Sequence, residues 1–324
     1  MDSGSNRSVN LQPSSRIGLR RIEPVKEIWM DGAFVKWEDA KVHLLTHTLH
    51  YGLGVFEGIR CYETVKGPAI FRFGEHMDRF YNSAHIVGIQ PNMDKEETCR
   101  SIIELIRRNG LTSCYIRPII YLGYGEMGVN NQAAPVHTAA ATWKWGAYLG
   151  EDGLKNGIRV KISSFTSHHV NSYMTKSKTC ANYGVSQMAK MEAVRDGYDE
   201  AIMLDPAGMV AQGSGENIFL VRNGALKTPP GVGVLEGITR DTILQLADAH
   251  EIKLSQEPFA RDELYIADEA FFTGTAAEIT PIREVDNRRI GTGQPGPVTR
   301  TLQDAFFRAV RGEDEAYEKW LTAV

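Results

Sequence analysis

The sequence predicts a mixed α/β (α+β) protein built from two domains. A chain of 324 residues is long for one hydrophobic core, and strand-like runs are mixed with amphipathic helices along its length. A second hydrophobic start follows the stretch 143–156, which we take as the connection between domains. We therefore expect a small N-terminal α/β domain at 23–142 and a large C-terminal domain at 157–324.

Composition and charge exclude several classes of protein. The apolar share of 42% and the charged share of 23% are ordinary for a soluble globular chain. No apolar run approaches the ~20 residues needed to span a bilayer. The net charge of −4 gives no basic footprint for nucleic acid. We therefore expect neither a membrane nor a nucleic acid as a partner.

The four cysteines point to a reducing compartment. They lie far apart and form no C-x-x-C pair, which argues against a metal site or a disulfide framework and favours the cytoplasm. Residues 1–22 are rich in Ser and Arg and lack the apolar segment of a secretory signal. We expect a poorly ordered tail there, with a transit peptide as the weaker alternative.

Turn residues and apolar periodicity predict the main elements. Hairpins are expected at three turns: Asp31-Gly32 within 27–42, Pro206–Gly208 within 200–213, and Asn223-Gly224 within 217–229. Amphipathic or capped helices are expected over 74–89, 95–110, 183–198 and 238–252. Further strands are expected over 113–125, 158–165 and 269–282, the last running into a Gly-Thr loop.

Two local signals concern the strand at 113–125. Pro118 inside it predicts a place near a sheet edge or a bulge, because proline has no N–H for the ladder. The following GYGEMG, Gly123 to Gly128, matches the dinucleotide-binding pattern G-x-G-x-x-G. The next residues lack helical periodicity and contain Pro135, so no helix N-terminus is available for a pyrophosphate. The pattern therefore does not indicate a dehydrogenase.

The segment NSYMTKSKTCANYG, residues 171–184, contains two lysines, Lys176 and Lys178. A catalytic lysine must present a neutral amine, which requires burial or charged neighbours. Most lysines are at the surface, so the local sequence does not decide between a solvated side chain and a covalent anchor.

Several motifs in one order resemble the branched-chain amino acid aminotransferases. The resemblance covers about 25–324 and rests on HTLHYGLGVFEGIRCY, EHMDRF, YIRP, GEMGVN, KWGAYLG, KTCANY, GYDEAIMLDPAGMVAQGSGENIFLV, LEGITRD, FFTGTAAEITPI and GPVTRTLQDAFF. Members of this family are class IV aminotransferases of fold type IV that use pyridoxal 5′-phosphate (PLP). The resemblance thus implies that fold, that cofactor, and Lys178 as the lysine that forms the Schiff base, with Lys176 as a solvated neighbour.

The resemblance also implies a cofactor site. Tyr183 would bond the phenolic oxygen of PLP, and Arg79 and Thr275 would contact the phosphate. Gly237, Ile238 and Thr239 begin a predicted helix, whose N-terminus suits an anion; capping by Thr239 is the plainer interpretation, and the two are compatible because the first-turn N–H groups stay unpaired within the helix. Glu216 matches the family pattern as well.

Gln212 departs from that pattern, because the family has a glutamate there to pair with the pyridine nitrogen. A neutral amide supplies a hydrogen bond but no counter-charge. The chain is therefore expected to be a weakened enzyme, a member with modified chemistry, or one in which Glu216 or water compensates.

The activity implied is ping-pong transamination between branched-chain L-amino acids (Leu, Ile, Val) and 2-oxoglutarate. The resemblance assigns apolar walls to Phe56, Trp145, Tyr148 and Tyr183, with Tyr51 and Val129 contributed by a second subunit. Arg117 would receive a distal carboxylate, while Tyr115, Thr275 and Ala276 would hold the α-carboxylate. Arg60 would orient polar groups or merely pair with an acid. A shared pocket implies a homodimer or a larger homo-oligomer.

Other members of the fold share the lysine and phosphate motifs. D-amino acid aminotransferase, aminodeoxychorismate lyase and (R)-amine aminotransferase are the alternatives among enzymes. YIRP, GEMGVN and KWGAY favour the branched-chain type. A catalytically weak PLP-binding protein is the alternative from another class, and Gln212 alone suggests it.

Overall fold

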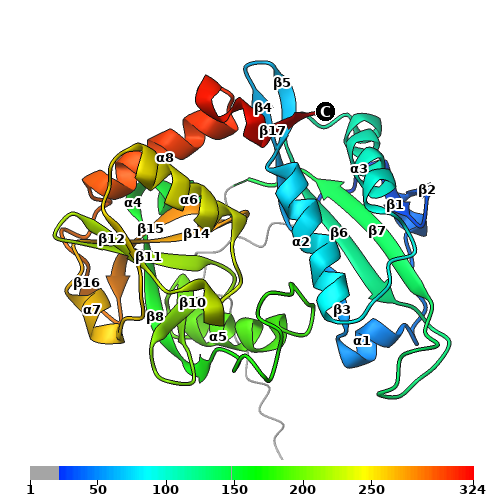
Figure 1. Cartoon of the computed structure of the whole chain (residues 1–324), viewed down its shortest axis with the longest axis horizontal. Coiled ribbons are helices and arrows are strands. Elements are labelled where there is room, and N and C mark those ends of the chain that lie inside the picture. The colour runs from blue at the N-terminus through cyan, green and yellow to red at the C-terminus, as the bar shows by residue number, and fades with distance from the viewer. Residues whose placement is uncertain (1–21, 147) are drawn as a thin grey trace, which may run out of the picture.

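The computed structural model describes residues 22–146 and 148–324 and has two lobes (Figure 1). The tail expected at 1–22 lies outside the described residues apart from Ile22. Each lobe contains one β-sheet with helices packed against it. The domain boundaries expected from the sequence stay a prediction, although the two sheets fall on either side of the expected connection.

The first lobe is an antiparallel sheet in the order β17-β5-β4-β6-β7-β1-β2, with β3 also paired to β6. Its strands are β1 (Glu27–Met30), β2 (Ala33–Lys36), β3 (Gly54–Phe56), β4 (Ile59–Thr64), β5 (Gly67–Phe71), β6 (Cys114–Leu122), β7 (Val136–Trp143) and β17 (Leu321–Ala323). Its helices are α1 (His47–Tyr51), α2 (Phe73–Ile86) and α3 (Lys95–Asn109), with a 3₁₀ turn at Trp37–Asp39. Apolar residues of α2 and α3 form one core with this sheet.

The second lobe is a mixed sheet in the order β10-β9-β8-β15-β14-β11-β12-β13, with β16 paired to β15. Its strands are β8 (Ile158–Thr166), β9 (Glu200–Leu204), β10 (Val210–Gly213), β11 (Asn217–Arg222), β12 (Ala225–Thr228), β13 (Leu254–Gln256), β14 (Glu269–Gly274), β15 (Glu278–Val285) and β16 (Arg288–Arg289). Its helices are α4 (Glu151–Asn156), α5 (Tyr183–Arg195), α6 (Ile238–Ala249), α7 (Arg261–Tyr265) and α8 (Pro297–Val310), with 3₁₀ turns at Gly231–Gly233 and Glu315–Trp320.

The two lobes share part of their core. Phe71 of the first sheet packs edge-on against Phe306 of α8 and against Trp320, with ring centroids 5.7 and 5.9 Å apart. Helix α2 lies on the side of the first lobe that faces the second (Figure 1). This apolar junction fixes α2 beside the second lobe, which decides where the site forms.

The structure confirms the hairpins and helices expected from turn and capping residues. Asp31 and Gly32 have φ of 48° and 87°, and Asn223 and Gly224 have φ of 51° and 74°, so both turns use the positive-φ pair that tight hairpins require. Helix α3 begins where Asp94 accepts the N–H of Glu97 and ends at Gly110, whose φ is 64°.

The expectation that β6 lies near an edge is wrong. Strand β6 is central, with β4 on one side and β7 on the other. The Glu57 N–H donates to Pro118 O at 3.0 Å, and an antiparallel pair of this kind normally exchanges a second bond, which proline cannot make. The missing bond falls at the break between β3, which ends at Phe56, and β4, which begins at Ile59.

Three other segments differ from or refine the sequence-based expectations. Residues 269–282 form the two antiparallel strands β14 and β15, joined by a turn at 275–277 where the Gly-Thr loop was expected; Glu278, whose φ is 53°, begins β15. The connection at 143–156 contains helix α4. Residues 123–135, all described, contain no helix after GYGEMG, which confirms that this pattern is not a dinucleotide-binding turn.

Candidate active site

A cavity opens where helix α2 meets the second lobe. Its empty space, including the open mouth, is about 870 Å³. Every residue that the resemblance assigns to the cofactor lines this cavity: Arg79, Lys178, Tyr183, Gln212, Glu216, Gly237, Ile238, Thr239 and Thr275. Residues far apart in the sequence are thus gathered around one space that holds a lysine amine, a phenol and a helix N-terminus.

The two lysines of the 171–184 segment have different surroundings. Lys178 Nζ donates to Tyr183 Oη at 2.6 Å and lies 5.1 Å from the centroid of the Phe56 ring. Lys176 points elsewhere, pairing with Glu236 at 2.6 Å and donating to a backbone carbonyl. The Lys176 side chain is 40% exposed, in agreement with the expected solvated neighbour, and its ion pair with Glu236 refines that expectation. Only Lys178 presents its amine to the cavity.

The first lobe holds the Lys178 backbone. Phe56 N–H donates to Lys178 O at 3.1 Å, and Cys180 N–H donates to Gly54 O at 2.9 Å, so this segment extends the β3 edge. The Lys178 N–H donates to Ser83 Oγ of α2 at 3.0 Å. Because both its neighbours and its own amide are fixed, the lysine side chain starts from a defined position.

The N-terminus of α6 lies in the cavity wall. Its N-cap residue is Gly237, and no side chain caps it, so plain capping by Thr239 is excluded. A Cβ at Gly237 would lie 2.1 Å from Asn217 Oδ1, which explains why this close approach uses glycine. The free first-turn N–H groups and the helix dipole suit an anion such as a phosphate.

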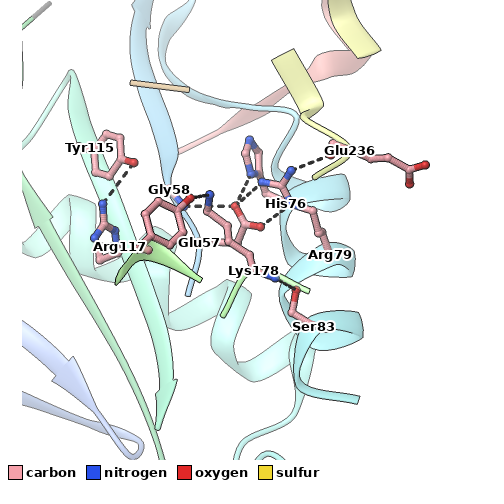
Figure 2. A network of polar contacts seen from close by, with 10 residues as sticks. Glu57, Gly58, His76, Arg79, Ser83, Tyr115, Arg117, Lys178 and Glu236 are labelled. Atoms are coloured by element: carbon pink, nitrogen blue, oxygen red, sulfur yellow. Dashed lines mark hydrogen bonds and ion pairs between the residues drawn. The ribbon is translucent and has the colours of Figure 1, made fainter. Parts of the chain in front are cut away.

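Arg79 reaches this helix from the first lobe. It donates to Glu57 through Nε at 2.6 Å and through a terminal nitrogen at 2.8 Å, and to Glu236 O at 2.9 Å (Figure 2). His76 Nδ1 lies 2.9 Å from the same carboxylate. Burial acts to raise the pKa of Glu57, but the Arg79 charge and the His76 hydrogen bond outweigh it and hold that pKa well below its usual range.

Gln212 and Glu216 lie at another part of the cavity wall. The Glu216 carboxylate folds back over the turn, accepting the Gly215 N–H at 3.0 Å; a Cβ at Gly213 would lie 2.7 Å from it. Burial and then the charge of Glu200 raise the pKa of Glu216 to about 8. Beside the neutral Gln212 amide there is therefore a carboxyl group that retains its proton near neutral pH.

Aromatic rings lead from Tyr183 to the expected substrate residues. The Phe56 ring lies 4.9 Å from Tyr183, and the Arg117 guanidinium lies 4.8 Å from Phe56. Arg117 also donates to Tyr115 Oη at 3.4 Å, while its buried Nε has no partner in the described structure. A Cβ at Gly58 would lie 1.9 Å from Tyr115 Oη, so this position requires glycine.

The aromatic wall continues across the connection between the lobes. The Tyr115 ring lies 4.4 Å from Trp145, and Trp145 lies 6.0 Å from Tyr148. Arg60 donates to the Trp145 and Gly146 carbonyls at 3.2 and 2.8 Å, which fixes this stretch.

Arg60 pairs with an acid as well. Its guanidinium lies 2.5 Å from Glu278, where the chain turns between β14 and β15 just after Thr275 and Ala276. Tyr62 donates to the same carboxylate at 3.0 Å. Arg60 thus ties the connection between the lobes to the turn that follows Thr275.

Tyr51 and Val129 are exposed, at 43% and 92%. Tyr51 ends α1, and Val129 lies in the loop after β6. The two segments are joined by the contact between His47 Nε2 and Gly128 O at 2.8 Å. Neither Tyr51 nor Val129 is among the described residues that line the cavity of one chain. The other residues expected at the substrate, apart from Tyr183 and Thr275, do not line it either: Phe56, Arg60, Tyr115, Arg117, Trp145, Tyr148 and Ala276.

Sequence reasoning missed three residues that support the site: Glu57, His76 and Ser83. His76, Arg79 and Ser83 follow each other at intervals of three and four on α2 and therefore share one face. This row of polar residues beside the apolar face of α2 was the sequence signal that could have identified His76 and Ser83. Glu57 had none, because its partners are distant in the sequence.

Comparisons with known proteins agree with this geometry. A family model described as class IV amino-transferase matches residues 54–285. The chain is 53% identical to the branched-chain-amino-acid aminotransferase of Pseudomonas aeruginosa, covering 92% of this chain and 97% of that protein.

Two solved structures are close in three dimensions. The Escherichia coli branched-chain amino acid aminotransferase has a TM-score of 0.90 at 45% identity, covering 92% of this chain and 98% of that one. The branched-chain amino acid aminotransferase of Thermobaculum terrenum, in its PLP form, has a TM-score of 0.87 at 35% identity, covering 93% and 98%.

The fold is thus that of an aminotransferase. The chain belongs to the class IV aminotransferase family and, within it, to the branched-chain-amino-acid aminotransferases. This confirms the family, the fold class and the enzyme class expected from the sequence. Within residues 22–146 and 148–324, no helix is both long and apolar enough to cross a membrane.

Proposed function

We propose that this chain is a PLP-dependent enzyme that transfers amino groups between branched-chain L-amino acids and 2-oxoglutarate. The observation that carries this proposal is the Lys178 amine, 2.6 Å from Tyr183 Oη in a cavity that also contains the uncapped N-terminus of α6. The related Thermobaculum terrenum structure, solved in its PLP form, supports the cofactor.

The residues present fit PLP. Gly237, Ile238 and Thr239 offer backbone N–H groups to the phosphate, with Arg79 and Thr275 beside them. Tyr183 would hold the phenolic oxygen, and Gln212, with Glu216 in the same cavity, would be the partner of the ring nitrogen. When bound, PLP supplies a reactive aldehyde and a ring that withdraws electrons from the substrate Cα.

Lys178 is the residue that moves protons. With the cofactor bound, its amine would take the proton from the substrate Cα as a general base and return it as a general acid at the cofactor. The Tyr183 hydroxyl orients this amine through the 2.6 Å contact. The backbone bonds from Ser83 and the β3 edge hold Lys178 in place for both halves of the ping-pong cycle.

Two kinds of substrate side chain share one pocket. The rings of Phe56, Trp145 and Tyr148 provide apolar walls for leucine, isoleucine and valine. Arg117, whose buried Nε lacks a partner in the described residues, supplies the charge for the distal carboxylate of glutamate or 2-oxoglutarate. Tyr115 and the backbone amides of Thr275 and Ala276 hold the α-carboxylate.

The pocket is completed by a second copy of the chain. An exposed apolar surface, which we call the α1 patch, consists of Leu44, Leu45, Leu49, Tyr51, Tyr124, Met127 and Val129. It includes both residues that the resemblance assigns to the partner subunit, so a homodimer that buries this patch brings Tyr51 and Val129 to the other active site. The four free cysteines suit the cytoplasm as the compartment.

A labelling experiment tests the anchor. Borohydride reduction of the PLP-loaded chain, followed by digestion and mass spectrometry, is expected to place a phosphopyridoxyl group on Lys178. Lys178→Ala should lose the label and the activity, whereas the matched control Lys176→Ala should keep both. A label on Lys176, or no label, would contradict the assignment.

A substrate panel tests the specificity. L-leucine should bleach the yellow absorbance of the loaded enzyme and form pyridoxamine 5′-phosphate, and 2-oxoglutarate should reverse the change. D-alanine and (R)-phenylethylamine should leave the absorbance unchanged. Turnover of D-alanine without turnover of L-leucine would overturn the substrate assignment.

A further inference from the structure

Glu57 is a fully buried carboxylate that sits behind the arginine of the phosphate site. It is 0% exposed and accepts Arg79 through both of its oxygens, at 2.6 and 2.8 Å. Oε2 also lies 2.9 Å from His76 Nδ1 and accepts the Gly58 N–H at 3.2 Å. Figure 2 shows these groups converging on the one carboxylate. A carboxylate this well partnered fixes the plane of the guanidinium that it binds.

Arg79 is held from two sides. Glu57 binds two of its nitrogens, and the third donates to Glu236 O, immediately before Gly237 at the start of α6. The guanidinium therefore bridges from the first lobe to the helix N-terminus that faces the cavity. Its side chain is 14% exposed, so the N–H bonds not used by Glu57 or Glu236 have little room to reorient.

The backbone explains why Glu57 is available for this role. It lies in the two-residue break between β3 and β4, opposite Pro118, where the ladder cannot complete its bond pair. Gly58 follows, with no space for a Cβ beside Tyr115. The break is thus fixed by packing on one side and by Pro118 on the other.

We propose that Glu57 is a positioning residue that holds Arg79 in the orientation needed to bind the cofactor phosphate. This inference rests on the proposed assignment of Arg79 to that phosphate. Glu57 is not among the described residues that line the cavity; it acts through Arg79, with His76 fixing the carboxylate from behind.

Two physical effects predict opposite changes in phosphate affinity when the Glu57 carboxylate is removed. Glu57 offsets the positive charge of Arg79, so by Coulomb attraction alone its loss should strengthen binding of a phosphate dianion. If Glu57 acts by orientation, its loss frees the guanidinium and weakens phosphate binding. The sign of the change therefore separates positioning from simple charge balance.

The test compares PLP with pyridoxal, which lacks the phosphate. Dissociation constants of both are measured by absorbance titration of the full chain freed of cofactor, for wild type, Glu57→Gln and Glu57→Asp. Glu57→Gln removes the charge and keeps the shape, whereas Glu57→Asp keeps the charge and withdraws the oxygens. Both should weaken PLP binding about tenfold or more while pyridoxal affinity changes less than about twofold.

The matched control is Glu269→Gln. Glu269 is also buried, accepts the Val298 and Thr299 N–H groups at 3.1 and 2.7 Å, and is not among the described residues that line the cavity. This variant should lose stability but keep the ratio of the two affinities. If Glu57 is merely structural, its variants should weaken PLP and pyridoxal equally, which would overturn the proposal. Stronger PLP binding by Glu57→Gln would overturn it as well.

A double-variant cycle tests the positioning role of Glu57 separately from the assignment of Arg79 to the cofactor phosphate. If Arg79→Gln leaves the ratio of PLP to pyridoxal affinity unchanged, the phosphate role of Arg79 fails, and the proposal for Glu57 fails with it. If Arg79→Gln lowers PLP affinity selectively, Glu57→Gln should add less than about twofold in that background. If Glu57→Gln lowered PLP affinity as much in the Arg79→Gln background as it does alone, Glu57 would not act through Arg79. That result would overturn the positioning role of Glu57 but not the phosphate role of Arg79.

Discussion

The Lys178 N–H donates to Ser83 Oγ at 3.0 Å, so helix α2 of the first lobe holds the lysine of the second. Ser83 is fully buried, and its carbonyl also accepts the Ser177 hydroxyl at 2.9 Å. Ser83→Ala should leave the Lys178 amide without its acceptor and loosen the reactive side chain. We expect kcat to fall about tenfold, because small displacements of a catalytic group are costly.

Ser163→Ala is the control for this substitution. Ser163 is buried as well and accepts a backbone N–H, from Phe165 at 3.0 Å, but it lies on β8, donates to Glu192 at 2.5 Å and, among the described residues, makes no hydrogen bond to the Lys178 segment. Both variants should lose about 1 kcal/mol or more in the free energy of unfolding. Steady-state kinetics and chemical denaturation together check the prediction; equal kcat values for the two variants would contradict it.

Gln212→Glu should raise the rate of transamination, by about tenfold, because a carboxylate supplies the counter-charge that an amide lacks. PLP affinity should stay within about threefold, since the lysine and phosphate contacts are unchanged. Stopped-flow absorbance with L-leucine measures the rate, and Gln90→Glu, at an exposed position, is the control. An unchanged or lower rate would count against Gln212 as the partner of the ring nitrogen.

Glu216 should make stability depend on pH. Burial and the Glu200 charge raise the pKa of Glu216 from an ordinary 4.5 to about 8, so the folded chain keeps a proton that the unfolded chain releases. This contribution to the free energy of unfolding is complete below the unfolded pKa and is lost as the pH rises through about 8.

Glu216→Gln cannot titrate, and its free energy of unfolding should therefore fall less than that of wild type between about pH 5 and about pH 9. Denaturant titrations of the cofactor-free chain at several pH values measure the difference. Other titrating groups are common to both proteins and cancel in the comparison. Parallel curves for the two proteins would show that the folded state does not hold this proton.

The α1 patch should govern assembly. Leu49 belongs to this patch and is 63% exposed, and Leu49→Asp places a charge where the proposed dimer buries apolar surface. We expect a monomer by light scattering, with loss of turnover because Tyr51 and Val129 no longer reach the second site. Val65→Asp, at a similarly exposed valine of the β4–β5 turn, should remain dimeric and active. A dimeric, active Leu49→Asp would exclude this interface.

Local chemistry explains which parts of the fold were predictable. The pairs Asp31-Gly32 and Asn223-Gly224 adopt positive φ at low cost, so their hairpins follow from composition. Gly110 ends α3 for the same reason. The Gly-Thr loop after β14 was expected, but the start of strand β15 at Glu278 was not, because the positive φ of Glu278 accompanies a buried ion pair with Arg60 rather than a favourable residue type.

The site was predictable where a motif carries its own role, as for Lys178 in KTCANY or Gly237 at the start of α6. The supports of those residues were not. Glu57 contacts Arg79 only because β3, β4 and α2 pack together. The position of Pro118 in a central strand is explained only by the gap between β3 and β4 opposite it. The pairing of Lys176 with Glu236 likewise depends on a tertiary contact.

Strand β17 returns from beyond α8 to pair with β5, joining Leu321 to Phe71. During synthesis, the edge of β5 stays unpaired until residues 321–323 have left the ribosome. The sheet of the first lobe therefore cannot be completed until the second lobe has been synthesised. Such long-range pairing slows folding and leaves a bare edge exposed in the meantime. Expressing the two lobes as separate polypeptides would thus deprive the first of a strand, and a bulky fusion placed against Ala323 would compete with the last rung of that sheet.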